Sequence, residues 1–166
     1  MASGIADIWT DVAPTSTFEG VNVVMNQQSS RYLLKQAKRA ASGKKCEGYF
    51  KYVNHLDELC NSKSEARTLA EFSSLEHLEK VMMVNSAAQL RHTYELLSES
   101  DAVEVVKQND LFADEVQRLS TLHIKFLLFV MARERIEETK FVDPKIKSIL
   151  NLIIRIYALK ELIKDN

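Results

Sequence analysis

A single carboxylate, Glu19, stands between an aromatic residue and a glycine in the segment Ser16-Thr-Phe-Glu-Gly20, directly before an expected helix. Two roles fit this residue at this place. The spacing from Ser16 to Glu19 is that of a capping box, in which both side chains accept backbone N–H groups at the start of a helix. A carboxylate shielded from water can also act as a general base. The spacing alone favours the cap, because such short patterns often arise by chance.

The other residues with catalytic or metal-binding potential form no familiar motif. There is no glycine-rich phosphate loop, no His-Glu-x-x-His, no Gly-x-Ser-x-Gly and no Cys-x-x-Cys. Cys46, His55 and Cys60 have a spacing that matches no common zinc site, so no metal is expected and the thiols should be free, as in a reducing compartment. The histidines are scattered, and each is expected on a helix surface or partly buried; they are His55, His77, His92 and His123.

The elements that must position Glu19 are long helices. The chain has only four glycines and two prolines, apolar residues recur at threes and fours, and no useful strand alternation appears. The expected helices are Val21–Ala41, Ser64–Leu97, about Ala102–Glu138 with an interruption at Asn109-Asp110, and a last helix from Pro144. The predicted fold class is therefore all-α, an antiparallel bundle of about four long helices.

Several finer expectations follow from these patterns. Ser42-Gly43 should end the first helix, and residues 44–59 should connect it to the second with one short helix. The apolar run Ile124–Ala132 is too short to span a bilayer and is expected to be a buried helix segment. The last helix is apolar over more than half its circumference, so it should be buried between helices or against a partner.

Composition limits the classes of partner. The 166 residues are 46% hydrophobic and 27% charged with a net charge of -1, which suits one globular domain. This balance gives no electrostatic footprint for nucleic acid or an anionic membrane, and the basic runs at 35–39 and 44–45 are expected to be solvated surface. No secretory signal or membrane span is predicted.

Two blocks of the sequence are specific enough to suggest a family. Thr17-Phe-Glu-Gly20 with Asn22, Gln28 and the block Arg31-Tyr-Leu-Leu-Lys35 resembles the Tyr/Phe-Glu-Gly region of the acyl-CoA oxidases. The stretch from Asp143, with Ile156-Tyr-Ala-Leu159 and the final Asn166, is similar to their C-terminal helical domain. The resemblance covers nearly the whole chain. It implies residues 1–42 as the end of the catalytic helical domain, 43–63 as a connection, and 64–166 as part of the C-terminal helical domain.

The resemblance implies a concrete chemistry. Acyl-CoA oxidases are FAD enzymes, usually peroxisomal homodimers, which convert acyl-CoA and O₂ to trans-2-enoyl-CoA and H₂O₂ in fatty acid β-oxidation. The match makes Glu19 the base that removes the α-proton of the thioester. Gly20 would let the backbone approach flavin and substrate without a Cβ, and Asn22 would be an FAD contact. No metal ligand is implied.

The chain also departs from the family pattern. Val21 stands where the family usually has an acidic residue, and the domains that hold most of the flavin and acyl-CoA are expected to be missing, with truncation at both ends. The chain is therefore expected to be inactive alone and not to retain FAD. Peroxisomal residence is implied by resemblance only; the last residues form no Ser-Lys-Leu-type address, so a cytoplasmic location stays open.

Two other readings remain open at this stage. A second hypothesis is a non-catalytic helical module, which pairs with itself or with a full-length oxidase through its apolar last helix. A third reading is an unrelated helical bundle whose Phe-Glu-Gly is a capping accident. Neither the acyl chain length nor the oligomeric state follows from the sequence.

Overall fold

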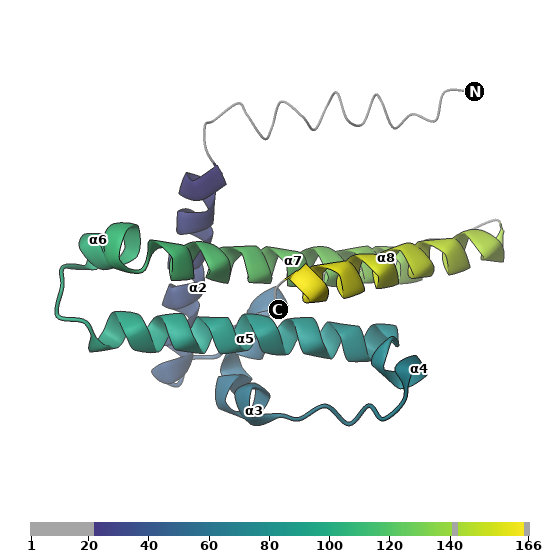
Figure 1. Ribbon diagram of the computed structural model, residues 1–166, viewed down its shortest axis with the longest axis horizontal. Helices are drawn as coiled ribbons and strands as arrows, with labels where there is room; N and C mark the ends of the chain where they lie inside the picture. Colours follow the sequence, from purple (N-terminus) through teal and green to yellow (C-terminus); the bar gives the residue numbers. More distant parts are fainter. Residues whose placement is uncertain (1–21, 141–142, 165–166) are drawn as a thin grey trace.

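The computed structural model describes residues 22–140 and 143–164, with side chains from Met25 onward. Within these ranges the chain is helical and contains no strand (Figure 1). Four long helices dominate it: α2 (Asn22–Ala41), α5 (Leu75–Glu99), α7 (Ala113–Glu138) and α8 (Pro144–Lys164). The predicted all-α class with about four long helices is confirmed.

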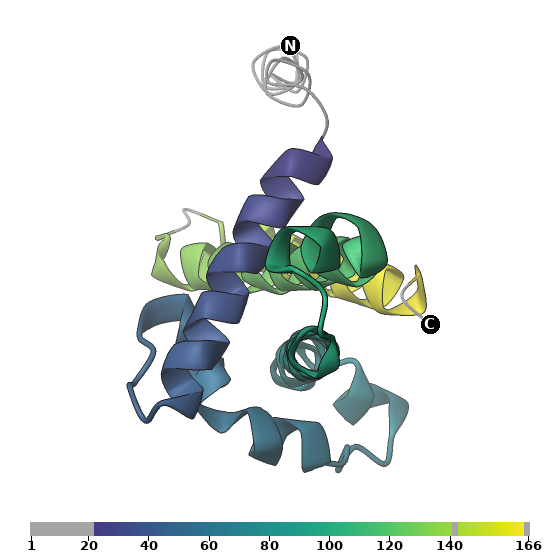
Figure 2. The ribbon, with the colours of Figure 1, turned by 90° about the vertical axis from the view of Figure 1, so that its left-hand side faces the viewer.

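The long helices run in two different directions. Helices α5, α7 and α8 lie side by side, each antiparallel to the one before it in the chain, whereas α2 runs across α7 and α5 (Figures 1 and 2). Short elements connect them: the 3-10 helix η2 (Gly48–His55), α3 (Leu56–Asn61), α4 (Leu69–Phe72), α6 (Glu104–Val106) and the π turn η3 (Lys107–Leu111). The predicted connection at 44–59 thus contains more helix than expected.

Helix α2 ends where the sequence predicts. Gly43 has a φ of 79°, a left-handed conformation that glycine adopts without the steric cost of a Cβ. Its N–H donates to the carbonyl of Ala40 at 2.9 Å, and the N–H of Lys44 donates to that of Arg39 at 3.1 Å. These bonds satisfy carbonyls at the end of the helix and turn the chain into the η2 segment.

The predicted helix over Ser64–Leu97 was wrong in its first turns. Thr68 and Ser74 each accept a backbone N–H through the side chain, from Glu71 and His77, so two separate helices begin there. Leu69 continues the apolar spacing of threes and fours, yet it is 82% exposed. Local capping by hydroxyl side chains therefore overrides the apolar spacing in this segment.

The third predicted helix is interrupted at the expected place. The π turn η3 spans Asn109 and Asp110, and α7 starts two residues after it ends. The start of α8 also agrees with the prediction, because Asp143 Oδ1 accepts the N–H of Lys145 at 2.8 Å while Pro144 occupies the first helical position.

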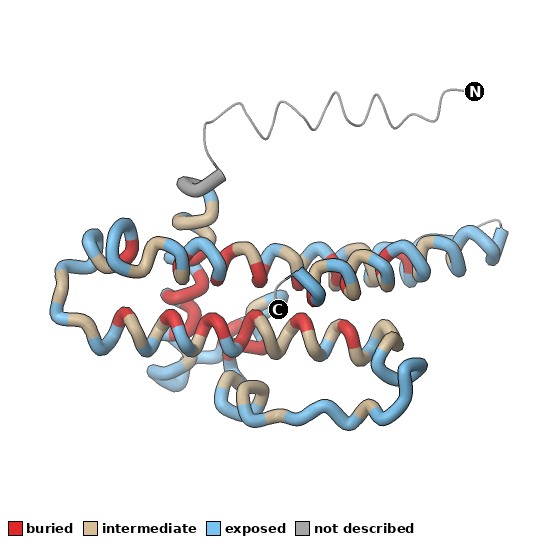
Figure 3. Tube along the Cα trace, viewed as in Figure 1, coloured by how far each residue is buried: buried red, intermediate tan, exposed pale blue. Residues whose placement is uncertain are grey.

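The core lies where α5 meets α7, α2 and α8 (Figure 3). Its fully buried large side chains include Leu33, Leu78, Leu90, Leu119 and Phe129. The run Ile124–Ala132 is only partly buried, which corrects its prediction: Ile124, Leu128 and Met131 are exposed on the side of α7 away from this core. In the described ranges, no helix is both long and apolar enough to cross a membrane.

Candidate functional site

The residues predicted to do chemistry lie at the edge of the described chain. Glu19 and Gly20 are outside the described residues, and Asn22 is the first residue of α2, without a described side chain. Their predicted roles therefore stay predictions. The structure does show what holds the helix that follows Glu19.

Hydrogen bonds hold the first half of α2 against α7. The buried Ser30 hydroxyl donates to the carbonyl of Val116, and the hydroxyl of Ser120 donates to Asn26 Oδ1 at 3.4 Å. Ser30, Val116 and Ser120 have no exposed surface. Small hydroxyl residues at this crossing let the two helices approach closely while their polar atoms remain paired.

The side chains of the Arg31-to-Lys35 block lie partly in the core and partly on the surface. Leu33 is 1% exposed and Leu34 8%, while Tyr32 packs on the surface with its ring edge toward Phe50, at a centroid distance of 5.2 Å. Arg31 reaches the π turn, where its Nε donates to Gln108 Oε1 at 2.9 Å and its Nη2 donates to Asn109 Oδ1 at 3.3 Å. The block therefore positions α2 against both the core and η3.

A cluster of buried polar side chains links η2, α5 and α7. The hydroxyl of Tyr52, on η2, lies 3.1 Å from Ser86 Oγ on α5 and 3.0 Å from His123 Nδ1 on α7. Phe50 stacks on the imidazole at a centroid distance of 5.4 Å. His123 is 4% exposed, so the prediction that each histidine is a surface or partly buried residue was wrong here.

The protonation of this cluster follows from burial. Burial lowers the pKa of His123 to about 4 and raises the pKa of Tyr52 to about 12, with the Ser86 bond opposing the rise. Both groups are therefore neutral near pH 7 and cannot exchange protons there. His123 Nε2 is buried with no protein partner. Leaving a lone pair there is less costly than leaving an N–H, which favours a proton on Nδ1, donated to Tyr52.

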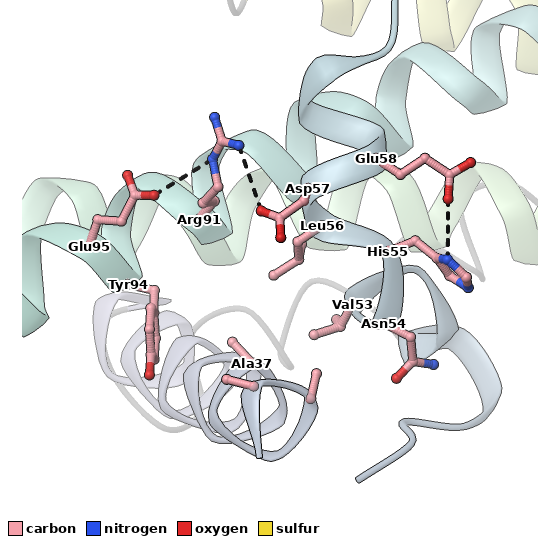
Figure 4. Close-up of a pocket in the computed structure, with 12 residues that line it drawn as sticks. Ala37, Val53, Asn54, His55, Leu56, Asp57, Glu58, Arg91, Tyr94 and Glu95 are labelled. Atoms are coloured by element: carbon pink, nitrogen blue, oxygen red, sulfur yellow. Dashed lines mark ion pairs between the residues drawn. The ribbon is translucent and has the colours of Figure 1, made fainter. Parts of the chain in front are cut away.

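A hollow with a charged rim lies between α2, α3 and α5 (Figure 4). It encloses about 520 Å³, with a floor that includes Ala37, Val53 and Leu56. Its rim is charged: Arg91 lies 3.9 Å from Asp57 and 3.7 Å from Glu95. These pairs are largely exposed, so they contribute little to stability.

The titratable groups in and near this hollow are not gathered as metal ligands or activated as nucleophiles in the described residues. His55 on its rim is 63% exposed and lies 3.4 Å from Glu58. Nearby Cys60 has its pKa raised, chiefly by burial, with Arg91 opposing the rise, so a thiolate is disfavoured. Both cysteines are free. Across the described residues, no three His, Cys, Asp or Glu side chains gather as metal ligands.

Taken together, the four long helices and the hydrogen bonds that hold α2 to α7 and η3 define an all-helical arrangement of the described residues. No protein-family model matches the chain. Curated proteins do match: peroxisomal acyl-coenzyme A oxidase 1 of Homo sapiens is 24% identical over 165 residues, and that of Rattus norvegicus is 26% identical over 167. Each alignment covers 95% of this chain and 24% of the relative. The protein of the same name from Phascolarctos cinereus is 43% identical over 54 residues, which are 32% of this chain and 8% of the relative.

Solved structures share the fold. An acyl-CoA oxidase from tomato (Lycopersicon esculentum) superposes with a TM-score of 0.84 at 21% identity, and acyl-CoA oxidase 1 of Arabidopsis thaliana with 0.83 at 22%. Both comparisons cover 92% of this chain and 23% of the solved chain. The chain is thus similar to acyl-CoA oxidases over nearly its whole length, as the resemblance predicted, and it spans about a quarter of the length of the curated relatives it matches.

Sequence reasoning missed the residues that tie the fold together. Tyr52 and Ser86 carry no motif, and His123 sits in an apolar run that could have suggested its burial. The contacts of Arg31 with the π turn lie 77 and 78 residues apart in sequence, a separation that no local pattern reveals.

Proposed function

We propose that this chain supplies the proton-abstracting glutamate and the adjoining helical region of an acyl-CoA oxidase. The observation that carries the proposal is the match over 95% of the chain to curated peroxisomal acyl-coenzyme A oxidases, together with Phe18-Glu19-Gly20 directly before α2. The division of the chain into the end of a catalytic domain (residues 1–42), a connection (43–63) and part of a C-terminal helical domain (64–166) belongs to this proposal.

In this role the Glu19 carboxylate takes the α-proton of an acyl-CoA thioester, while a hydride leaves the β-carbon and a trans-2-enoyl-CoA forms. FAD, when bound, would accept the hydride and pass the electrons to O₂, which gives H₂O₂. A carboxylate can do this only if desolvation raises its basicity and hydrogen bonds to the thioester carbonyl acidify the α-carbon. Gly20 leaves room at the backbone for these ligands.

The rigidity of α2 matters to this proposal. Ser30 and Arg31 hold the helix to α7 and to the π turn, and they follow Glu19 by eleven and twelve positions in the sequence. A base must stay within hydrogen-bond reach of the proton that it removes. The contacts of α2 therefore support a positioning role for this helix.

We further propose that the 166 residues alone bind no FAD and turn over no acyl-CoA, since they span about a quarter of the length of the acyl-CoA oxidases that they match. Peroxisomal location is proposed from the relatives only. The purified chain should show no absorption near about 450 nm, where oxidised flavin absorbs. A yellow preparation with one FAD per chain would overturn this part.

The catalytic role is tested by a chimera. The corresponding quarter of the tomato oxidase is replaced by this chain, and acyl-CoA-dependent H₂O₂ formation is compared between the chimera and its Glu19→Gln variant. Flavin content serves as the control for folding. Loss of activity at unchanged flavin content supports the base, whereas unchanged activity contradicts it.

The outer face of α8 favours a second candidate, a helical pairing module. Isoleucines recur on this face at spacings of three and four and are 45–76% exposed; they are Ile146, Ile149, Ile153, Ile156 and Ile163. Such a stripe is the pattern of helix–helix interfaces. It suits a second copy of this chain or the rest of an oxidase.

A double variant, Ile153→Lys with Ile156→Lys, separates these roles. In the wild-type chain the pairing module predicts a dimer by light scattering, and in the variant a monomer with unchanged helicity. A wild-type chain that stays monomeric at high concentration would argue against self-pairing and leave the oxidase role intact.

A further inference from the structure

Positive charge is concentrated in one part of this nearly neutral chain. Residues 31–51, which we call the basic segment, contain seven of the 22 Lys and Arg residues and one of the 23 Asp and Glu residues, Glu47. The basic segment therefore carries a net charge of +6, and the remaining residues together carry −7. The sequence alone suggested solvated surface for the runs at 35–39 and 44–45. The seven cations are Arg31, Lys35, Lys38, Arg39, Lys44, Lys45 and Lys51.

Four of these cations lie on the exposed side of α2. Arg31, Lys35 and Arg39 are spaced by four residues, Lys38 lies one turn after Lys35, and all four are exposed. Lys38 and Arg39 stabilise the helix, because its C-terminal end carries partial negative charge. Arg31 and Lys35 lie too far from that end to do so, and like charges four residues apart on a helix repel one another. Helix stability therefore does not explain the whole row.

The loop after α2 adds three more exposed cations. The basic segment follows α2 downward in Figure 2 and turns at its lower end into η2. Lys44, Lys45 and Lys51 line a hollow of about 550 Å³ there. Asn54 fixes the loop, since its Oδ1 accepts the N–H of Cys46 at 2.8 Å and its Nδ2 donates to the carbonyl of Cys46 at 2.9 Å. The Cys46 thiol also donates to a backbone carbonyl of α2 at 3.4 Å. A loop that is already ordered loses little conformational freedom when a partner binds.

The cations of the basic segment have no charged partners within the described residues. None of the seven forms an ion pair there, and Arg31 bonds only to the neutral amides of Gln108 and Asn109. Glu47 stands at the N-cap of η2 without a capping bond from its side chain. The fold thus displays this charge uncompensated, whereas cations elsewhere are paired with carboxylates; they include Arg91, Lys125, Arg133, Lys147 and Lys164.

We propose that the basic segment is the docking surface for an acidic peptide segment of a partner protein. Carboxylates of this peptide lie along Arg31, Lys35 and Arg39 and around the hollow beside Lys44 and Lys45. The row on α2 rises about 12 Å, which about four residues of extended peptide span, and the loop prolongs it. Complementary charge of this kind speeds encounter and selects the partner.

The charge of the rest of the chain favours a short acidic peptide over a larger polyanion. Residues outside the basic segment carry −7, so a nucleic acid or an anionic membrane that extends past the segment meets charge of its own sign. A peptide with about six carboxylates matches the charge of the segment and stays within it. The docking surface uses neither Glu19 nor the outer face of α8, so it stands or falls independently of both proposed functions.

The experiment is fluorescence anisotropy of a labelled peptide of six glutamates titrated with the full chain, at about 0.1 M salt, where charges are screened beyond about 10 Å. The same peptide with glutamines is the uncharged probe. Lys44→Glu/Lys45→Glu is compared with Lys63→Glu/Lys80→Glu, which makes the same change of charge at exposed positions outside the basic segment. Glu47→Lys tests the opposite direction, because Glu47 has no side-chain capping bond to lose. Circular dichroism checks that each variant keeps the helicity of the wild type.

The glutamate peptide should bind saturably and the glutamine peptide should not. Lys44→Glu/Lys45→Glu should lose at least about tenfold in affinity, because two attractions become repulsions. The Lys63→Glu/Lys80→Glu control should stay within about twofold of the wild type, since screened charges outside the surface contribute weakly. Glu47→Lys should bind more tightly than the wild type, a gain that damage to the fold would not produce.

Four results would each overturn the proposal. They are equal losses in the two double variants, no gain in Glu47→Lys, no binding of the glutamate peptide to the wild type, and tighter binding of a different polyanion. The polyanions tested are a single-stranded oligothymidine with six phosphates and vesicles of equimolar phosphatidylserine and phosphatidylcholine.

Discussion

Replacing His123 with asparagine should flatten the dependence of stability on pH between about pH 7.5 and 5. His123 is 4% exposed, and burial lowers its pKa to about 4 in the folded chain, from an ordinary value of 6.5. The folded state therefore stays unprotonated at this site while the unfolded state takes up a proton. Asparagine does not titrate, and its amide can still bond to Tyr52 from the Nδ1 position.

The sign and size follow from proton linkage. Because the folded pKa is the lower one, the contribution of His123 is fully present above pH 6.5 and is lost as the pH falls toward 4. Between pH 7.5 and 5 the loss amounts to about 2 kcal/mol of the free energy of unfolding. Below pH 5 the carboxylates begin to titrate as well, so the comparison stops there.

The assay is urea unfolding followed by circular dichroism at several pH values, for the wild type and for His123→Asn. His77→Asn provides a matched control, because His77 lies near the start of α5 on the surface hollow lined by Ser64 and Lys80. The wild type and the control should lose stability on acidification while His123→Asn holds nearly constant. Parallel curves for all three proteins would refute a buried neutral imidazole.

Three further substitutions test the fold. Ser74→Ala removes the N-cap of α5 and should lower the free energy of unfolding in urea by about 0.5–2 kcal/mol. An unchanged unfolding midpoint would contradict a stabilising role of this cap. Phe129→Ala should cost about 3–5 kcal/mol because the ring is fully buried, while the neighbouring Leu128→Ala, 54% exposed, should cost well under half of that. Tyr52→Phe leaves Ser86 and His123 without their shared partner and should cost about 1–3 kcal/mol. A Tyr52→Phe variant as stable as the wild type would contradict a stabilising role of the hydrogen bonds between Tyr52, Ser86 and His123.

The sequence predicted the long helices because their signals are local. Gly43 stops α2, Asp143 and Pro144 start α8, and the polar pair Asn109-Asp110 marks the interruption before α7. The start of α5 was misplaced since the apolar spacing continues through Leu69 and Phe72, whose side chains are exposed. Periodicity alone cannot tell an apolar residue in the core from one on the surface.

The candidate site was less accessible to prediction. Glu19, Gly20 and Asn22 came from resemblance to a family, and the match of the chain to acyl-CoA oxidases agrees with that resemblance. The cluster of Tyr52, Ser86 and His123 depends on contacts across 34 and 71 residues, which only the packing of η2 against α5 and α7 creates.

The most direct test of the proposed function is the rate of H₂O₂ formation by the tomato-oxidase chimera before and after Glu19→Gln, measured at equal flavin content. If Glu19 is the base, the substitution should lower the rate by about 10²–10⁴-fold, the usual contribution of a general base. A Glu47→Gln chimera, with the same chemical change in the loop before η2, should keep the parent rate. A Glu19→Gln chimera that forms H₂O₂ as fast as its parent would contradict the account.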